Sequence, residues 1–311
     1  MNAVISAAPS VKKTRLLYAA VRFQGYLGLL AVFVLGVIFS PVKDSTNLFL
    51  DVTNQMNILR YVAETGIIAI GMTLVILVGE IDLSVGAVLA SGAVFGFVNG
   101  FISTSFKIPS FVTTLAMMSF ARGLARLVFG GVAIPLLAIS MGGSAPEDAF
   151  FVNNRLGGVL PVPALFMFGV AIIVSVALRY TPFGRHVYAV GGNPVAAHLS
   201  GVRVEFTKVM VFALCGVLTA MAAFVHAIQL NQGAPNDGFA YELNAIAAVV
   251  IGGTSLQGGI GTIAGAVAGA WMLGMIDNVL NLNNVQADVQ LLVKGALIVI
   301  AVALQRLQRR T

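Results

Sequence analysis

Charged residues are scarce in this chain of 311 residues: only 10% are Asp, Glu, Lys or Arg, whereas 58% are apolar. A soluble domain usually carries about a quarter charged residues, so this composition excludes an ordinary soluble protein and indicates a membrane protein. Cysteine is nearly absent as well. With Cys215 alone, no disulfide can form within the chain.

Signatures of catalysis and of tightly bound cofactors are missing from the sequence too. The three histidines and the one cysteine are scattered along the chain, so they form no pattern of metal ligands. The glycine-rich stretch IGGTSLQGG lacks the Lys-Ser/Thr pair of a phosphate-binding loop, and G-x-x-x-x-G-K-[ST] occurs nowhere. We therefore expect a protein that is not an enzyme and that binds no cofactor in this chain.

The basic residues indicate how the chain is oriented. A net charge of +6 is compatible with nucleic-acid binding, but Lys12, Lys13, Arg15 and Arg22 precede the first apolar run, and Arg306, Arg309 and Arg310 follow the last. Basic flanks are typical of the cytoplasmic side of a membrane protein. We expect basic cytoplasmic termini (1–22 and 306–311) around one transmembrane domain (23–305). The first apolar run, 23–42, exceeds the roughly 7–15 residues of a signal-peptide core and is interpreted as a retained span.

The apolar runs predict an all-α, polytopic helical bundle, since a span needs roughly 20 mostly apolar residues. The run from Leu243 to Ile276 is too long for one crossing, and its glycines near 252–261 predict a break or re-entrant bend between two helices. About nine apolar segments result: 23–42, 57–79, 83–106, 109–130, 157–179, 206–230, 243–256, 259–280 and 289–305.

The loop charges conflict with a simple topology at one place. Loops without Lys or Arg are placed outside, and the arginine-bearing loop 180–205 is placed inside. Counting from both ends then puts Glu80 and Lys107 on the same, cytoplasmic side. The segment 83–106 between them is therefore either re-entrant, or one crossing is missing from the chain.

The two glycine-rich breaks resemble each other. Residues 75–86 and 249–259 each read as an apolar helix that ends in glycine, followed by polar residues and another glycine. Broken helices at matching places in two halves of a chain indicate a transport pathway. The candidate pathway residues are Glu80, Asp82, Ser84, Gly86, Gly252, Gly253, Thr254 and Ser255.

Other charged residues also fall within apolar runs, where charge is costly and is usually turned toward the bundle interior. Arg122 and Arg126 are four residues apart and share a helix face, so we expect them to pair with Glu64 or another carboxylate. Lys208 and His226 lie near opposite ends of one predicted span. We expect these two side chains to extend to the membrane interfaces.

A short capped helix is predicted within the cytoplasmic loop 180–205. Asn193 is a good N-cap, Pro194 suits the first helical position, and Gly201 fits a left-handed C-terminal cap. A capped helix of about two turns in a basic loop is well placed to be bound by another protein. An ordinary connecting loop is the alternative interpretation of the same residues.

Four motifs, in order along residues 55–305, resemble the ribose/xylose-type sugar permeases of bacterial ABC importers. They are EIDLSVG (80–86), IPSFVTTLAMMSFARGL (108–124), FGR through GGNP (183–194) and ELNAIAAVVIGGTSL (242–256). The resemblance implies a homodimer of helical subunits in the bacterial inner membrane. It also implies a separate ATPase, which holds ATP and Mg, and a periplasmic sugar-binding protein.

The resemblance further implies that the 194–200 helix couples the permease to that ATPase. Val195 departs from the family, which often has Glu there. Because selectivity is implied to lie largely in the binding protein, the expected substrate is only a pentose or similar monosaccharide. The residues matched to the coupling segment are Gly184, Arg185, Gly192, Asn193, Pro194, Ala196, Ala197, Leu199 and Gly201.

One departure from the family is larger. About 25 more residues, roughly one span, usually follow the D-L-S-V-G motif, whereas in this chain Gly86 is followed only by AVLASGAVFGFVNG. One of the family's ten spans is therefore expected to be absent near 93–95, through a real deletion or an omission from the sequence. The alternatives to an importer subunit are a stand-alone secondary carrier for a small polar solute and a transport-inactive subunit.

Overall fold

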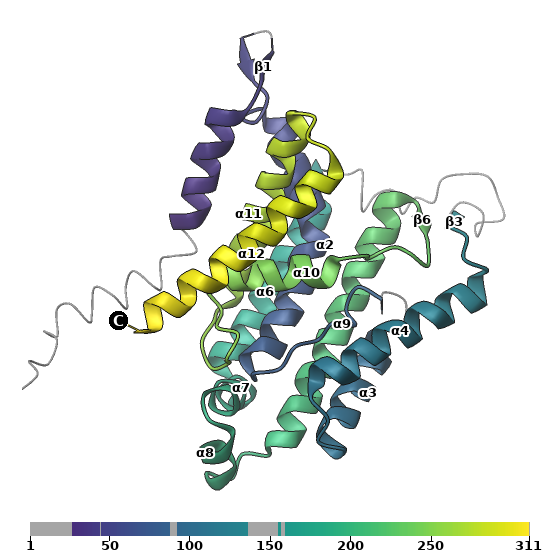
Figure 1. The fold of residues 1–311 in the computed structure, drawn as a ribbon, viewed down its shortest axis with the longest axis vertical. Helices are drawn as coiled ribbons and strands as arrows, with labels where there is room; N and C mark the ends of the chain where they lie inside the picture. The colour runs from purple at the N-terminus through teal and green to yellow at the C-terminus, as the bar shows by residue number, and fades with distance from the viewer. Residues whose placement is uncertain (1–26, 44, 88–91, 136–154, 157–158, 311) are drawn as a thin grey trace, which may run out of the picture.

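The computed structural model describes residues 27–43, 45–87, 92–135, 155–156 and 159–310. The predicted cytoplasmic segment 1–22 and most of the predicted outer loop 131–156 lie outside these residues. The described part of the chain is predominantly α-helical, as expected (Figure 1). Within the described residues, the strands form three antiparallel pairs, each strand two residues long.

The helices and strands are numbered in their order along the chain. The helices are Leu27–Phe39, α2 (Val52–Leu77), α3 (Gly92–Ser105), α4 (Ser110–Phe129), α6 (Val162–Tyr180), α7 (Pro182–Gly192), α8 (Pro194–Leu199), α9 (Val204–Leu230), α10 (Tyr241–Ile251), α11 (Ile263–Leu282) and α12 (Ala287–Arg310). The antiparallel strand pairs are β1 (Val42–Lys43) with β2 (Thr46–Asn47), β3 (Ile134–Pro135) with β6 (Gln232–Gly233), and β4 (Arg155–Leu156) with β5 (Leu160–Pro161).

Five of the described helices are long and apolar enough to cross a membrane: α2, α4, α6, α9 and α11. The helix Leu27–Phe39, the apolar part of α3 and α10 are shorter apolar helices. Each of the nine predicted segments overlaps a helix, but a count of nine crossings is not confirmed. The five long apolar helices support a multi-pass helical membrane protein.

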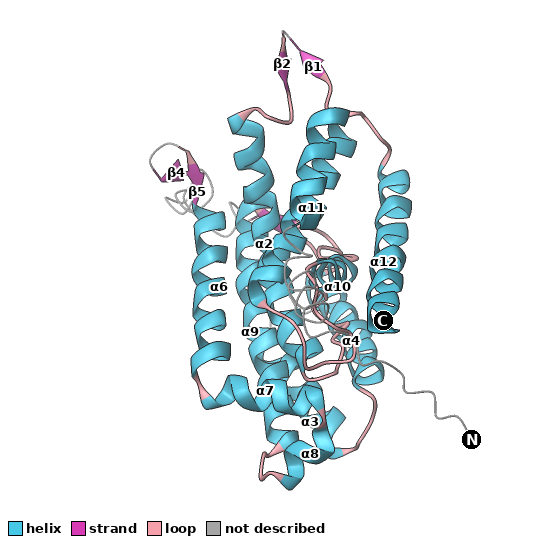
Figure 2. Ribbon diagram, turned by 90° about the vertical axis from the view of Figure 1, so that its left-hand side faces the viewer, coloured by secondary structure: helices cyan, strands magenta, loops and turns pink. Residues whose placement is uncertain are grey.

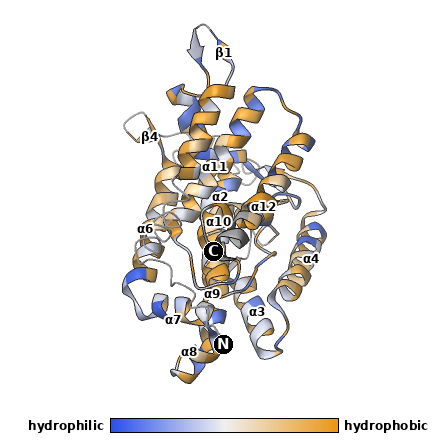
Figure 3. Ribbon diagram, turned by 60° about the vertical axis from the view of Figure 1, so that its left-hand side comes forward, coloured by the Kyte–Doolittle hydropathy of each residue, from blue (hydrophilic) through white to orange (hydrophobic). Residues whose placement is uncertain are grey.

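Helix α2 forms the centre of the bundle, with α9, α11, α6 and α10 packed around it (Figures 1 and 2). In the most apolar part of α2, 83% of the residues are buried, compared with 17% in α4. A helix that is apolar on all sides is stable in that central position. The outward faces of α4 and α6 carry exposed apolar side chains, including Leu127 and Ile173, which suits contact with lipid (Figure 3).

The chain after α2 enters the bundle and returns to the same end. Its extended segment 79–86 begins with Glu80 beside Lys208, near the start of α9, and ends against the loop that precedes α10. Helix α3 then runs back along α9, so that Gly100 packs against Val209. The described residues on either side of 88–91 therefore place Glu80 and the end of α3 at the same end of the bundle.

The second predicted break, within the run from Leu243 to Ile276, is confirmed. Helix α10 ends at Ile251, and α11 begins at Ile263 after a glycine-rich loop. The Thr262 side chain caps α11 by accepting a hydrogen bond of 3.0 Å from the Gly265 N–H. A Cβ atom at Gly269 would lie 1.9 Å from the Ala248 carbonyl oxygen, so α10 and α11 approach as closely as glycine alone allows.

Candidate functional site

Helix α7 turns the chain away from the bundle at the lower end in Figure 1. The Thr181 side chain caps it, accepting a hydrogen bond of 3.4 Å from the Gly184 N–H. A Cβ atom at Gly184 would lie only 1.9 Å from the Leu178 carbonyl oxygen. Gly184 is therefore needed for the tight turn from α6 into α7, whereas the neighbouring Arg185 is exposed.

Helix α8 forms where the sequence predicts it. The Asn193 side-chain oxygen accepts hydrogen bonds of 3.0 Å from the N–H groups of Val195 and Ala196, and Pro194 occupies the first turn. After the helix, Gly201 has a φ of +84°, the left-handed conformation that favours glycine. The caps therefore define where this short helix begins and ends.

The surface of α8 is mostly exposed. Only Ala197 is buried, at 5% exposure, and it anchors the helix to the rest of the chain. Val195 and Leu199 are 68% and 81% exposed and lie four residues apart, so they share one face. The other residues matched to the coupling segment, Gly192, Pro194 and Ala196, are exposed as well. Helix α8 thus presents a small apolar face outward.

Four glycines from three separate segments meet behind α8. We call Gly79, Gly191, Gly258 and Gly259 the glycine junction. The Gly259 N–H donates a hydrogen bond of 2.9 Å to the carbonyl oxygen of Leu77, the last residue of α2. A Cβ atom at Gly191, near the end of α7, would lie 1.7 Å from that same oxygen. The junction therefore packs backbone directly against backbone.

Tyr188 adds a side-chain connection from α7 to the second break. Its Oη donates a hydrogen bond of 2.9 Å to the carbonyl oxygen of Gly261. Burial raises the pKa of Tyr188, so the phenol stays protonated and remains a donor at neutral pH. Helix α7 is therefore fixed to both breaks, the one after α2 and the one after α10.

The predicted pathway residues of the first break are held by local bonds. Asp82 is 2% exposed and accepts hydrogen bonds from Ser84, 2.9 Å from its N–H and 2.6 Å from its Oγ. Asn99 on α3 donates a bond of 2.9 Å to the Ser84 Oγ. Glu80 forms an ion pair with Lys208. This pair lies near the start of α9, where the Lys208 side chain remains 24% exposed.

The predicted pathway residues of the second break stabilise the conformation of the loop between α10 and α11. Thr254 and Ser255 are buried, and the Ser255 N–H donates a hydrogen bond of 2.8 Å to the Ile260 carbonyl oxygen. A Cβ atom at Gly252 would lie 2.1 Å from the Gly265 carbonyl oxygen, and Gly253 has a φ of +91°. The structure thus brings the two breaks together through the glycine junction.

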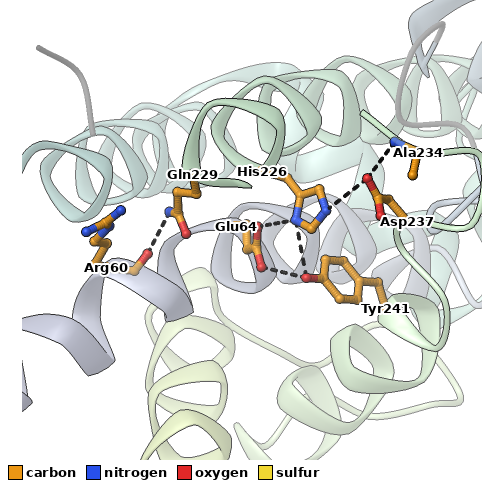
Figure 4. Close-up of polar contacts among 7 residues, drawn as sticks. All are labelled: Arg60, Glu64, His226, Gln229, Ala234, Asp237 and Tyr241. Carbon is orange, nitrogen blue, oxygen red and sulfur yellow. Dashed lines mark hydrogen bonds and ion pairs between the residues drawn. The ribbon is translucent and has the colours of Figure 1, made fainter. Parts of the chain in front are cut away.

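A buried polar cluster joins α2, α9 and α10 at the other end of α9 (Figure 4). His226 Nδ1 lies 2.7 Å from Glu64 Oε2, and the Tyr241 Oη donates a hydrogen bond of 2.6 Å to Glu64 Oε1. Asp237 Oδ2 lies 3.7 Å from His226 Nε2 and accepts a bond of 2.8 Å from the Ala234 N–H. The expectation that His226 extends to the interface is wrong, because Glu64 holds it inside.

The two arginines of α4 do not pair with Glu64, but Arg122 interacts electrostatically with another carboxylate across the bundle, that of Glu242 on α10. Arg126 Nη2 donates a hydrogen bond of 2.7 Å to the side-chain oxygen of Asn236, and the Arg122 guanidinium lies 5.8 Å from the centre of the Phe239 ring. Both contacts attach α4 to the segment between β6 and α10. The i, i+4 spacing correctly predicts that the two arginines share a helix face. The two carboxylate oxygens of Glu64, however, already form hydrogen bonds with His226 and Tyr241.

A cavity of about 460 Å³ adjoins the polar cluster. Its walls come from α4, α9, the end of the extended segment 79–86 and residues 232–237, and the β3–β6 pair closes one side. Gly86 is the one predicted pathway residue that lines it. Asp237 and Gln232, which also line it, were not predicted. The only sequence signal near them is His226 within an apolar run.

Comparison with known proteins identifies similar chains over most of this length. Residues 89–302, more than half of the chain, match the family described as branched-chain amino acid transport system / permease component. The ribose import permease protein of Bacillus subtilis is 41% identical over 302 residues, covering 89% of this chain and 91% of that protein. The L-arabinose transport system permease protein of Escherichia coli is 32% identical, with 93% of each chain covered.

A xylose transport system permease protein of Haemophilus influenzae is 33% identical over 91% of this chain and 96% of its own length. No solved structure matches the chain. In the Bacillus subtilis alignment, 89% of this chain is about 277 residues, so about 25 of the 302 aligned positions have no residue in this chain. This deficit agrees in size with the stretch expected to be absent after Gly86.

Proposed function

This chain belongs to the permease family that includes the ribose, xylose and arabinose permeases named above, and we propose that it is the membrane subunit of an ATP-driven monosaccharide importer. Its substrate is a pentose or similar sugar. It lies in the bacterial inner membrane, with both termini in the cytoplasm. Permease subunits of this family are not enzymes themselves, so the energy for transport comes from a partner ATPase.

The observation that carries this proposal is the attachment of α8 to both helix breaks. Helix α8 offers Val195 and Leu199 as an exposed apolar face for an ATPase groove. Behind it, α7 contacts α2 and the loop after α10 through backbone atoms at Gly191 and Gly259. These backbone contacts contain no side chain that could change its rotamer to absorb a movement. A displacement of α8 and α7 therefore also displaces both helix breaks.

Three partners complete this proposal. An ATP-binding cassette ATPase, holding ATP and Mg, docks on α8, and closure of its two copies moves the α8 helices of a permease homodimer. A periplasmic sugar-binding protein delivers the substrate from the other side. Sugar then passes between inward-facing and outward-facing arrangements of the helices.

A stand-alone secondary carrier is less well supported. Such a carrier needs a titratable or ion-binding group that changes partners during transport. Among the described residues, Glu64 is bound by His226 and Tyr241, Glu80 by Lys208, and Asp82 by Ser84. A carrier also has no need for a capped, exposed helix such as α8.

Co-purification with the ATPase tests the proposal. The tagged chain is isolated from its native cells in mild detergent, and the proteins that accompany it are identified and counted by mass spectrometry. We expect an ATPase with a phosphate-binding loop in equal amount, and we expect Leu199→Asp to lose it. Leu199 is 81% exposed, so that variant should still fold.

The matched control is Val42→Asp in the β1–β2 hairpin, which lies at the opposite end of the bundle (Figure 2). Val42 is 66% exposed, so the same kind of change is made on a similarly exposed apolar side chain. This variant should retain the ATPase. Loss of the ATPase from both variants, or from neither, contradicts docking on α8.

A further inference from the structure

The cavity beside the polar cluster has the features of a small-molecule site. Its volume of about 460 Å³ lies within the roughly 300–1,000 Å³ typical of such sites. Most of the wall is apolar: Ala220, Ala223 and Ala227 recur along one face of α9, and Ala125 faces them from α4. Small side chains on two facing helices leave this space open.

Three polar side chains, His226, Asp237 and Gln232, interrupt this apolar wall. His226 is 8% exposed, and its Nε2 is buried without a hydrogen-bond partner among the described residues. The nearest carboxylate oxygen, Asp237 Oδ2 at 3.7 Å, is too distant for a direct hydrogen bond. A buried polar atom without a partner is costly, and a ligand hydroxyl that bonds both groups from the cavity would supply that partner.

The Glu64 carboxylate fixes the direction of His226. His226 Nδ1 lies 2.7 Å from Glu64 Oε2, and the hydrogen bond between these two groups orients the imidazole ring. Tyr241 bonds the other carboxylate oxygen and prevents Glu64 from rotating away. The ring is thereby held with Nε2 toward Asp237, as Figure 4 shows, and both residues line the cavity.

We propose that this cavity binds the sugar in transit, with a hydroxyl of the sugar bridging His226 Nε2 and Asp237. Sugar hydroxyls both donate and accept, which matches a carboxylate, an imidazole and the Gln232 amide. The rings of Phe129 and Phe224, which line the same wall, offer apolar surface to the C–H face of the sugar. This inference rests on the proposed function and adds the place and the groups that hold the substrate.

The lining also selects against other solutes. No Lys or Arg is among the described residues that line the cavity, so an anionic solute such as a phosphorylated sugar would be bound without charge compensation. The carboxylate of a branched-chain amino acid would likewise find no Lys or Arg among these residues. A neutral, hydroxyl-rich ligand is the class that fits.

Saturation-transfer NMR on the purified full-length chain, without the binding protein, tests the proposal directly. The probes are D-ribose, D-xylose, L-arabinose and, as the amino-acid comparison, L-leucine. We expect saturation transfer to at least one sugar and none to leucine. Asp237→Asn should reduce the signal at least fivefold while still accepting the Ala234 N–H bond.

Ala125→Leu fills the cavity from α4, and Ala116→Leu makes the same change on the exposed part of that helix, outside the cavity. The first should abolish the sugar signal and the second should leave it unchanged, with both variants eluting as the wild type does in gel filtration. Absence of any sugar signal from the wild type, or equal signals from both variants, overturns the site. ATP-driven uptake by the wild-type complex, measured in parallel, decides the proposed function separately.

Discussion

Replacement of Gly191 by Ala tests the glycine junction most sharply. The added Cβ would lie 1.7 Å from the Leu77 carbonyl oxygen and 2.6 Å from the Gly259 nitrogen, so it would separate two groups that now share a hydrogen bond of 2.9 Å. Both atoms belong to the backbone and cannot rotate away. The side chain of alanine therefore forces α7 apart from the end of α2 and the loop after α10.

The size of the effect follows from two contributions. Overpacking costs about 1–3 kcal/mol, and loss of the backbone hydrogen bond costs about 0.5–1.5 kcal/mol, so Gly191→Ala should destabilise the chain by about 2–4 kcal/mol. At about 2–4 °C per kcal/mol, the Tm should fall by roughly 5–15 °C. ATP-driven sugar uptake should fall further than the amount of folded protein, because α8 is then no longer held against the breaks.

Two measurements check this prediction: thermal unfolding of the purified chain in detergent, and uptake into vesicles normalised to folded protein. Gly169→Ala is the matched control, since Gly169 lies on the exposed side of α6 with no atom within 4 Å of the added Cβ. That variant should be unchanged or more stable by up to about 1 kcal/mol. Equal Tm and uptake for the two variants would refute the junction as a rigid connection.

The remaining predictions concern the α8 cap, the ion pair and the re-entrant segment. Asn193→Ala removes two capping hydrogen bonds, which should destabilise α8 by about 1 kcal/mol. The variant should therefore co-purify with less ATPase than the wild type, and co-purification of the full amount would contradict a preformed docking helix. Lys208→Met leaves Glu80 unpaired and should lower stability by about 1–3 kcal/mol, whereas adding Glu80→Gln should restore part of it in a double-mutant cycle. In a variant without the native cysteine, a cysteine at Lys107 should be labelled from the opposite face to one at Lys43; labelling from the same face would exclude a re-entrant segment.

Local features of the chain were predictable from the sequence. Helix α8 depends on Asn193, Pro194 and Gly201, whose effects act within one turn, so the cap residues alone define its bounds. The break between α10 and α11 was predicted for the same reason, because its glycines are close together in the chain. The resemblance to sugar permeases, drawn from four motifs, is confirmed by the comparisons.

Contacts between distant segments were not predictable in the same way. Glu64 and His226 are 162 residues apart, and either arginine of α4 was an equally good partner for Glu64 before the helix arrangement was known. The glycine junction joins three segments whose glycines serve equally well as turn residues when considered separately. The loop charges located the irregularity at 83–106, but re-entry and a missing crossing predict the same charges on both sides.

The most direct test of the whole account is ATP-driven uptake by the reconstituted complex. The wild-type chain, its ATPase and the periplasmic binding protein are placed in liposomes, and uptake of labelled pentose and ATP hydrolysis are measured together. We predict uptake that requires ATP, and we predict that Leu199→Asp abolishes both uptake and the ATPase activity that depends on the permease. Uptake driven by an ion gradient without ATP, or full activity of the Leu199→Asp variant, would contradict the account.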